Sequence, residues 1–298
     1  MKPAAFAYAA PTTLAEALRV LASPRPAPAL PLAGGYSLLP RLARRTVRPA
    51  LLVDLGRLPG LDGVEITDDT VRIGALARLH RLERDPALRA ALPVLPATIG
   101  LVAHRQIRLR TTLGGSLCHA DPAAELPTLA LGLDARLLLD STTGGPRTVP
   151  ADSFFLGPHH TARRPDELLL AVEFPTGAPH RRAVFEEIPR SPAPGLPLVC
   201  VLVSGLLVDA HDTPHPTGVR IAAGGVADRP IRLPAAEAAL ADHPLDTTLD
   251  SVLDAATRDT APVPDHHGAP DYRIAMLRTA LARAVSRLHR PVPPEQSP

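Results

Sequence analysis

The sequence predicts a mixed α/β protein made of three consecutive regions. Segments with helical spacing of apolar residues alternate with short apolar strands along most of the 298 residues. The hydrophobic content of 45% is enough for a substantial core, and the 36 prolines lie between the periodic segments rather than in one biased stretch. We therefore expect a globular protein with stiff loops.

The first region, residues 1–56, is predicted to be a compact βαβ-like unit. Thr13 begins a helix, because a glutamate follows at the spacing of a capping box and leucines then repeat on one face. Strands are predicted at 29–33 and 50–55, on either side of a polar helix at 37–45. This region ends where the apolar pattern changes.

The second region spans residues 57–175. An alternating apolar pattern on both sides of Asp68-Asp69 predicts a β-hairpin. Asp121-Pro122 matches the preferred residues at the start of a helix, so a helix is predicted to open there. The other predicted elements are helices near 78–83 and at 87–102 and strands at 135–139 and 168–174.

The third region, residues 176–290, combines buried strands with helices. The longest helical pattern of the chain, 272–289, repeats apolar residues on one face. A tail at 291–298 is expected to fray. The other predicted elements are strands at 199–208 and 218–223 and helices at 235–241 and 249–257.

Composition and charge exclude several classes of protein. A formal charge of +2 argues against a nucleic-acid partner. The longest apolar stretch, 198–208, is about half of the ~20 residues that a membrane helix needs, and the N-terminus shows no secretion signal. Cys118 and Cys200 belong to no Cys-x-x-Cys pair, so the chain alone holds no iron–sulfur cluster. We expect a cytoplasmic protein without a membrane partner; a homo-oligomer stays open.

A double-glycine segment between a predicted strand and a predicted helix is the first candidate site. It consists of Ala33, Gly34, Gly35, Tyr36 and Ser37. Glycines let backbone N–H groups approach a ligand with no Cβ in the way, and the start of a helix suits a pyrophosphate. The segment is neither a Rossmann fingerprint nor a P-loop. The alternative interpretation is a tight turn with Ser37 as the helix cap.

A second double-glycine segment is accompanied by hydroxyls and two carboxylates. Its residues are Thr112, Leu113, Gly114, Gly115 and Ser116, followed by Asp121 and Glu125. In such a set the carboxylates accept hydrogen bonds from sugar hydroxyls while backbone amides hold a phosphate. The alternative interpretation is a loop followed by a well-capped helix.

The sequence predicts no metal site, and the catalytic residues stay unassigned. His159-His160 and His266-His267 are adjacent pairs whose side chains diverge, and neither has a third ligand nearby in the sequence. The chain contains no Gly-x-Ser-x-Gly nucleophile elbow, and Cys118 has no recognisable base partner. Cys118 is therefore interpreted as a packing residue.

The two double-glycine segments, in this order, resemble those of the FAD-binding medium subunit of molybdenum hydroxylases. This family includes the carbon monoxide dehydrogenase and xanthine dehydrogenase flavoproteins. The resemblance implies a two-subdomain FAD-binding region of the vanillyl-alcohol-oxidase/PCMH type, residues 1–56 and 57–175, followed by a C-terminal α/β domain at 176–290. The other segments that carry it are 52–56, 106–108, 119–127, 154–157, 165–169, 224–227 and 271–273.

The resemblance also implies a cofactor and its contacts. FAD would lie extended between the parts, with its diphosphate held by residues 33–37 and 112–116. Asp121 and Glu125 match polar positions near the ribityl and adenosine portions, and Leu169 matches a position beside the isoalloxazine ring. The flavin would supply the redox chemistry, and the chain would supply position and electrostatics.

In this family the chain passes electrons between an iron–sulfur small subunit, which works with a molybdopterin large subunit, and an external acceptor. One stretch departs from the family pattern. At 186–197 the family usually has a basic segment leading to a Gly-acid-aromatic group, whereas four prolines stand here. Two alternatives therefore stay open: a stand-alone FAD-dependent enzyme acting on an organic substrate, and a non-catalytic flavin-binding scaffold subunit.

Overall fold

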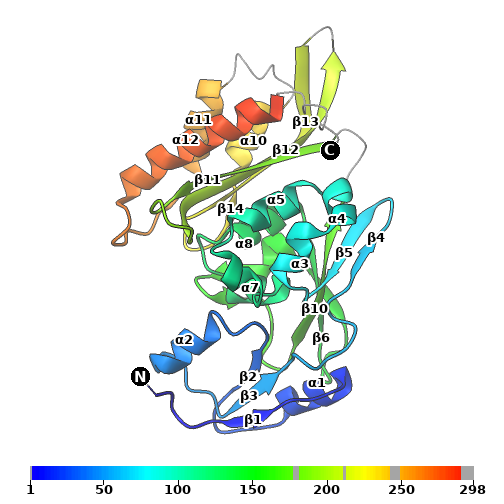
Figure 1. Ribbon diagram of the computed structural model, residues 1–298. Helices are drawn as coiled ribbons and strands as arrows, with labels where there is room; N and C mark the ends of the chain where they lie inside the picture. The colour runs from blue at the N-terminus through cyan, green and yellow to red at the C-terminus, as the bar shows by residue number, and fades with distance from the viewer. Residues whose placement is uncertain (1, 177–180, 211–212, 242–248, 290–298) are drawn as a thin grey trace.

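A computed structural model describes residues 2–176, 181–210, 213–241 and 249–289. Its three regions are stacked in chain order, with the N-terminal region at one end and the C-terminal region at the other (Figure 1). The tail at 291–298 lies outside the described residues. Within the described ranges, no helix has the length and apolar character needed to cross a membrane.

The N-terminal region is a three-stranded parallel sheet of order β1-β3-β2 with two helices. Its elements are β1 (Ala7–Ala9), α1 (Leu14–Ala22), β2 (Ala29–Leu32), α2 (Leu38–Ala43) and β3 (Leu51–Asp54). The predicted capping box is confirmed, because the Thr13 hydroxyl accepts a hydrogen bond from the Glu16 amide at 3.2 Å. The predicted βαβ-like unit is present, and β1 extends it by one edge strand.

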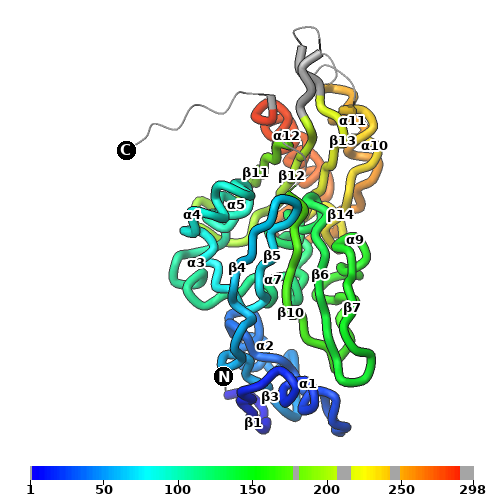
Figure 2. The backbone as a smooth tube through the Cα atoms, turned by 90° about the vertical axis from the view of Figure 1, so that its right-hand side faces the viewer, coloured from blue at the N-terminus to red at the C-terminus, as the bar shows by residue number. Residues whose placement is uncertain are grey.

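The middle region is built on a five-stranded antiparallel sheet of order β4-β5-β10-β6-β7. Figure 2 shows β4, β5, β10 and β6 side by side. The hairpin predicted around Asp68-Asp69 is confirmed as the pair β4 and β5. The strands are β4 (Val64–Ile66), β5 (Thr70–Gly74), β6 (Arg136–Asp140), β7 (Arg147–Pro150) and β10 (Leu168–Pro175), with β8 (Phe155–Gly157) and β9 (His160–Thr161) as a separate ribbon.

Short helices accompany this sheet, and all except the one at residues 105–108 contribute side chains to one hydrophobic core. They are α3 (Leu79–Arg84), α4 (Pro86–Ala91), α5 (Val94–Leu101), α6 (Arg105–Arg108), α7 (Leu113–His119), α8 (Glu125–Gly132) and α9 (Ala151–Phe154). Two helix predictions were wrong. The helix predicted at 87–102 is two helices, because Pro93 disfavours helical backbone at the residue before it. The helix predicted to open at Asp121 begins at Glu125, because the Asp121 carboxylate accepts the Ala123 amide at 3.0 Å and closes a turn instead.

The C-terminal region joins an antiparallel sheet of order β11-β12-β13-β14 to three helices in the described residues. Its elements are β11 (Arg181–Pro189), β12 (Pro197–Ala210), β13 (Thr213–Gly224), β14 (Ile231–Arg232), α10 (Pro234–Leu240), α11 (Leu249–Arg258) and α12 (Pro270–His289). Of the stretch 186–197, residues 186–189 are the end of β11, residues 190–196 form the connection to β12, and residue 197 begins β12.

The start of α12 is fastened to the sheet by a buried arginine. Arg273 is 3% exposed, and its guanidinium donates to the carbonyl oxygens of Leu198 and Gly225 at 2.8 and 2.9 Å. It also pairs with Asp265 at 2.7 Å. The matching segments at 224–227 and 271–273 therefore have a structural role in this fold.

Strand β12 packs on both faces and so connects the C-terminal and middle regions. Val201 and Val203 belong to the core that includes residues of α10, α11 and α12, whereas Cys200 and Leu202 belong to the core of the middle region. This alternation follows from the two-residue period of a strand. Gly132 of α8 lies so close that a Cβ there would be 2.4 Å from a Leu202 methyl carbon.

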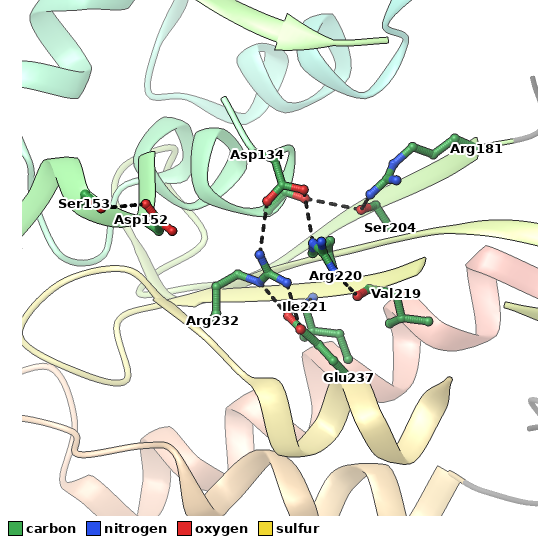
Figure 3. Close-up of polar contacts among 11 residues, drawn as sticks. Asp134, Asp152, Ser153, Arg181, Ser204, Val219, Arg220, Ile221, Arg232 and Glu237 are labelled. Atoms are coloured by element: carbon green, nitrogen blue, oxygen red, sulfur yellow. Dashed lines mark hydrogen bonds and ion pairs between the residues drawn. The ribbon is translucent and has the colours of Figure 1, made fainter. Parts of the chain in front are cut away.

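A polar cluster stabilises the same contact (Figure 3). Asp134, just after α8, accepts hydrogen bonds from Arg220 at 3.1 Å and from Arg232 at 3.2 Å. Arg232 also pairs with Glu237 of α10 at 2.5 Å, and the Glu237 carboxylate accepts the Ile221 amide at 2.8 Å. The C-terminal sheet is thereby tied through side chains to the end of α8.

Candidate functional site

A cavity of about 380 Å³ is lined by residues of both the N-terminal and the middle region. Asp121 and Glu125 are not in its wall, and Leu113 is fully buried in the hydrophobic core behind it. The structure thus brings together residues far apart in the sequence. The predicted site residues in the wall are Ala33, Gly34, Gly35, Tyr36, Ser37, Thr112, Gly114, Gly115, Ser116 and Leu169.

The first double-glycine turn presents a row of free backbone donors. Within the described part of the chain, the amides of residues 34–38 have no hydrogen-bond acceptor. Gly35 has a φ of +86°, a conformation that other residues rarely adopt, and its carbonyl accepts the Leu39 amide at 2.8 Å. Successive free N–H groups in a turn form an anion-binding concavity. This turn is therefore a preformed cradle for a phosphate.

The second double-glycine segment contributes differently from what its sequence indicated. Gly114 and Gly115 lie inside α7, and their amides donate to the Ala75 carbonyl at 2.9 Å and to the Thr112 hydroxyl at 3.1 Å. A Cβ at Gly114 would lie 2.6 Å from the Cβ of Ala75. The absence of a side chain here allows close packing, and α7 adds the Ser116 residue to the wall.

The titratable side chains of the wall are basic, apart from one thiol and one phenol. Arg41 and Arg163 lie in it, together with His119 and His159. No aspartate or glutamate among the described residues lines the cavity. A concave site of one sign attracts ligands of the opposite charge. The free amides and these basic groups together fit a diphosphate.

His119 and His159 form a stacked pair in the wall. Their ring centroids are 4.5 Å apart at an interplanar angle of 28°. His159 Nδ1 donates to the His119 carbonyl at 3.0 Å. Burial lowers the pKa of His119, His159 and Arg41 lower it further, and Asp121 opposes them. In the absence of an anion the His119 ring is therefore held in its neutral form.

Asp121 lies beside this pair, so that one polar atom from each of the three residues falls within 4.8 Å of the others. The 159–160 pair has no third ligand nearby along the chain, and the fold brings Asp121 to it. Because the two rings are nearly parallel, their in-plane lone pairs run alongside each other, whereas a shared metal needs them to converge. We assign no metal ion to this cluster.

Glu125 lies at the first position of α8, against the C-terminal sheet, and is 2% exposed. Its Oε1 has no hydrogen-bond partner among the described residues. Burial raises the pKa of Glu125 to about 8, and Glu187 and Asp121 act in the same direction. Burial and Glu186 raise the pKa of Glu187 to about 7. Glu125 therefore keeps its proton at neutral pH and can donate a hydrogen bond.

Comparison with known families identifies the two parts of the chain. Residues 4–177 match the FAD-binding domain in molybdopterin dehydrogenase, and residues 183–288 match the CO dehydrogenase flavoprotein C-terminal domain. The chain belongs to this flavoprotein family. The resemblance noted in the sequence, the mixed fold and the FAD cofactor are thereby confirmed.

Relatives match this flavoprotein over its whole length. The 6-hydroxypseudooxynicotine dehydrogenase complex subunit alpha of Paenarthrobacter nicotinovorans is 34% identical over 100% of this chain and 99% of its own length. The carbon monoxide dehydrogenase medium chain of Hydrogenophaga pseudoflava is 31% identical over 96% and 98%. A chain in the crystal structure of quinoline 2-oxidoreductase from Pseudomonas putida 86 superposes with a TM-score of 0.89 at 33% identity, covering 97% of this chain and 98% of that one.

Four basic residues of the flavoprotein's cavity were missed in the sequence. Arg41 and His119 each lie a few residues beyond a double-glycine segment, so their nearness to the motifs was the available signal. His159 lies 40 residues from His119, and Arg163 follows it. Only the fold brings this second pair into the wall, and no local pattern could have placed it there.

Proposed function

We propose that this flavoprotein is the electron-transfer subunit of a molybdenum hydroxylase complex. It would pass electrons between an iron–sulfur subunit, working with a molybdopterin subunit, and an external acceptor. The observation that carries the proposal is the whole-length similarity to proteins named as a complex subunit and as a medium chain. The sequence contains two cysteines, too few to ligate an iron–sulfur cluster, so a partner must supply that group.

The cavity supports specific roles for its residues. The free amides of 34–38 would hold the FAD diphosphate, and Ser116 would donate from the facing helix. Leu169, which lines the cavity, is proposed to lie beside the isoalloxazine ring, and Asp121 and Glu125 are proposed to lie near the ribityl and adenosine portions, behind the wall. When bound, FAD supplies one- and two-electron transfer. The chain binds it, orients it and shields part of it from water.

The experiment that tests this proposal compares the chain alone with the chain co-expressed with its genomic neighbours. The protein alone should be yellow and should release FAD, not FMN, on denaturation. Co-expression should yield a complex containing iron–sulfur and molybdopterin subunits, in which substrate reduces the flavin through the partners. A protein that takes up no FAD would refute the cofactor role.

The same preparation separates the two alternatives. Rapid reduction of the isolated flavoprotein by an organic substrate would favour a stand-alone enzyme, and a bound flavin that no partner or donor reduces would favour a scaffold. We expect slow reduction of the isolated chain by NADH in anaerobic stopped-flow mixing, because the connection at 190–196 lacks the family's acid and aromatic residues. A cytoplasmic location is also proposed, supported by the free thiols of Cys118 and Cys200.

A further inference from the structure

We infer that binding of FAD to this cavity is coupled to the uptake of a proton by the His119–His159 imidazole pair. This inference rests on the proposed role of the chain as an FAD carrier. It adds to that role a set of recognition residues outside the double-glycine segments and a dependence of cofactor retention on pH.

The first support is the composition of the cavity wall. Arg41, Arg163, His119 and His159 contribute to it, and no carboxylate from the described residues does. Neither arginine pairs with an acidic side chain in the described part of the chain. The diphosphate of FAD would therefore bring negative charge into a wall that holds none, while Asp121 lies beside the histidine pair but outside the wall.

The second support is the way in which the two rings are held. The stack has a centroid separation of 4.5 Å, and the bond from His159 Nδ1 to the His119 carbonyl fixes the tautomer of His159. Because that bond uses Nδ1 alone, the pair can accept a proton without breaking it. A second proton on the pair would bring two cations into contact, so the pair takes up one.

The groups around the pair explain why the proton arrives with the ligand. Arg41 comes from α2, Arg163 from the segment after β9 and Asp121 from the turn before α8, while Cys118 precedes His119 on α7. Burial and the neighbouring positive groups keep the pKa of His119 low in the free protein. A bound diphosphate raises the pKa of His119 again, because its negative charge attracts the positive imidazolium that the arginines repel. Ligand and proton then strengthen each other's binding reciprocally.

The experiment is a titration of flavin-free full-length protein with FAD by isothermal calorimetry. Two buffers of different ionisation enthalpy at neutral pH report directly how many protons are taken up. We expect net uptake, and an FAD Kd about tenfold lower at about pH 6 than at about pH 8. Riboflavin, which carries the same ring without phosphates, should bind with a Kd that does not depend on pH.

Substitutions of the two histidines test whether the pair takes up the proton. His119→Gln and His159→Gln should each reduce the pH dependence and leave FAD affinity at low pH close to the value at high pH. His160→Gln is the matched control, because His160 is adjacent in sequence but lies outside the wall, and it should titrate like the wild type. The calorimetric proton count on the unmodified protein needs no variant, so a misfolded variant leaves the inference testable.

The possible outcomes distinguish the inference of proton uptake from the proposed function as an FAD carrier. FAD binding with no proton uptake, or with a pH dependence that survives both His119→Gln and His159→Gln, would overturn the inference and leave the FAD carrier intact. Failure to bind FAD at any pH would instead overturn the proposed function.

Discussion

Replacing Glu125 with glutamine should stabilise the flavin-free protein above neutral pH. Burial raises the pKa of this carboxyl from 4.5 to about 8. Between these values the folded state holds a proton that the unfolded chain has released, so each pH unit lowers the free energy of unfolding by about 1.4 kcal/mol. Across the window from 4.5 to about 8 the loss is about 5 kcal/mol. Glutamine is neutral in the folded and the unfolded state, so the Glu125→Gln variant does not lose this stability as the pH rises.

At low pH the effect should reverse. Below pH 4.5 the carboxyl is protonated in both states, and the glutamine amide adds a donor at a position where one oxygen already lacks a partner. That costs about 1 kcal/mol, so the two stability curves cross near pH 5 to 6. Urea unfolding followed by circular dichroism at about pH 4 and about pH 8.5 measures the difference between variant and wild type on both sides of the crossing.

Glu65→Gln is the control for this prediction. Glu65 is exposed on β4, so Glu65→Gln should change stability little and equally at both pH values. If Glu125→Gln shifts the free energy of unfolding by the same amount at both pH values, the carboxyl titrates normally in the folded protein. The reasoning from burial would then be wrong.

Three further predictions test packing. Gly34→Val should lower the melting temperature and abolish FAD retention, because its Cβ would lie 2.5 Å from the Arg110 carbonyl oxygen, whereas Gly63→Val meets nothing within 4 Å and should do neither. Asp134→Ala should cost about 1 kcal/mol in urea unfolding, because it removes two solvent-accessible ion pairs and Arg232 keeps Glu237 as a partner. A chain ending at residue 175, the proposed boundary, should fail to unfold cooperatively, because the next sheet supplies part of its core; a cooperative, FAD-binding fragment would contradict this.

The sequence predicted most strands and helices because their signals are local. The capping box at Thr13, the hairpin around Asp68-Asp69 and the long apolar face of α12 depend only on neighbouring residues. The first double-glycine turn was equally readable, since it lies between a strand and a helix. These elements formed where their patterns indicated.

The roles of several site residues could not be predicted from the sequence, because they depend on contacts between distant segments. The amides of Gly114 and Gly115 looked available for a phosphate, but one is bonded to Ala75, far back in the chain. Glu125 looked like a polar contact in a helix start and is buried by a sheet that begins about fifty residues later. The roles of these residues depend on tertiary packing, which no spacing rule contains.

The cofactor cavity has consequences for how the protein matures. One wall comes from the small N-terminal sheet region and the other from α7 of the middle region, so neither region alone encloses the ligand. A ligand held between two regions stabilises the state in which they are joined. FAD should thus act as an assembly factor as well as a redox group. Flavin supply in the cell would then set how much of the chain becomes resistant to proteases, and flavin content would report the assembled fraction.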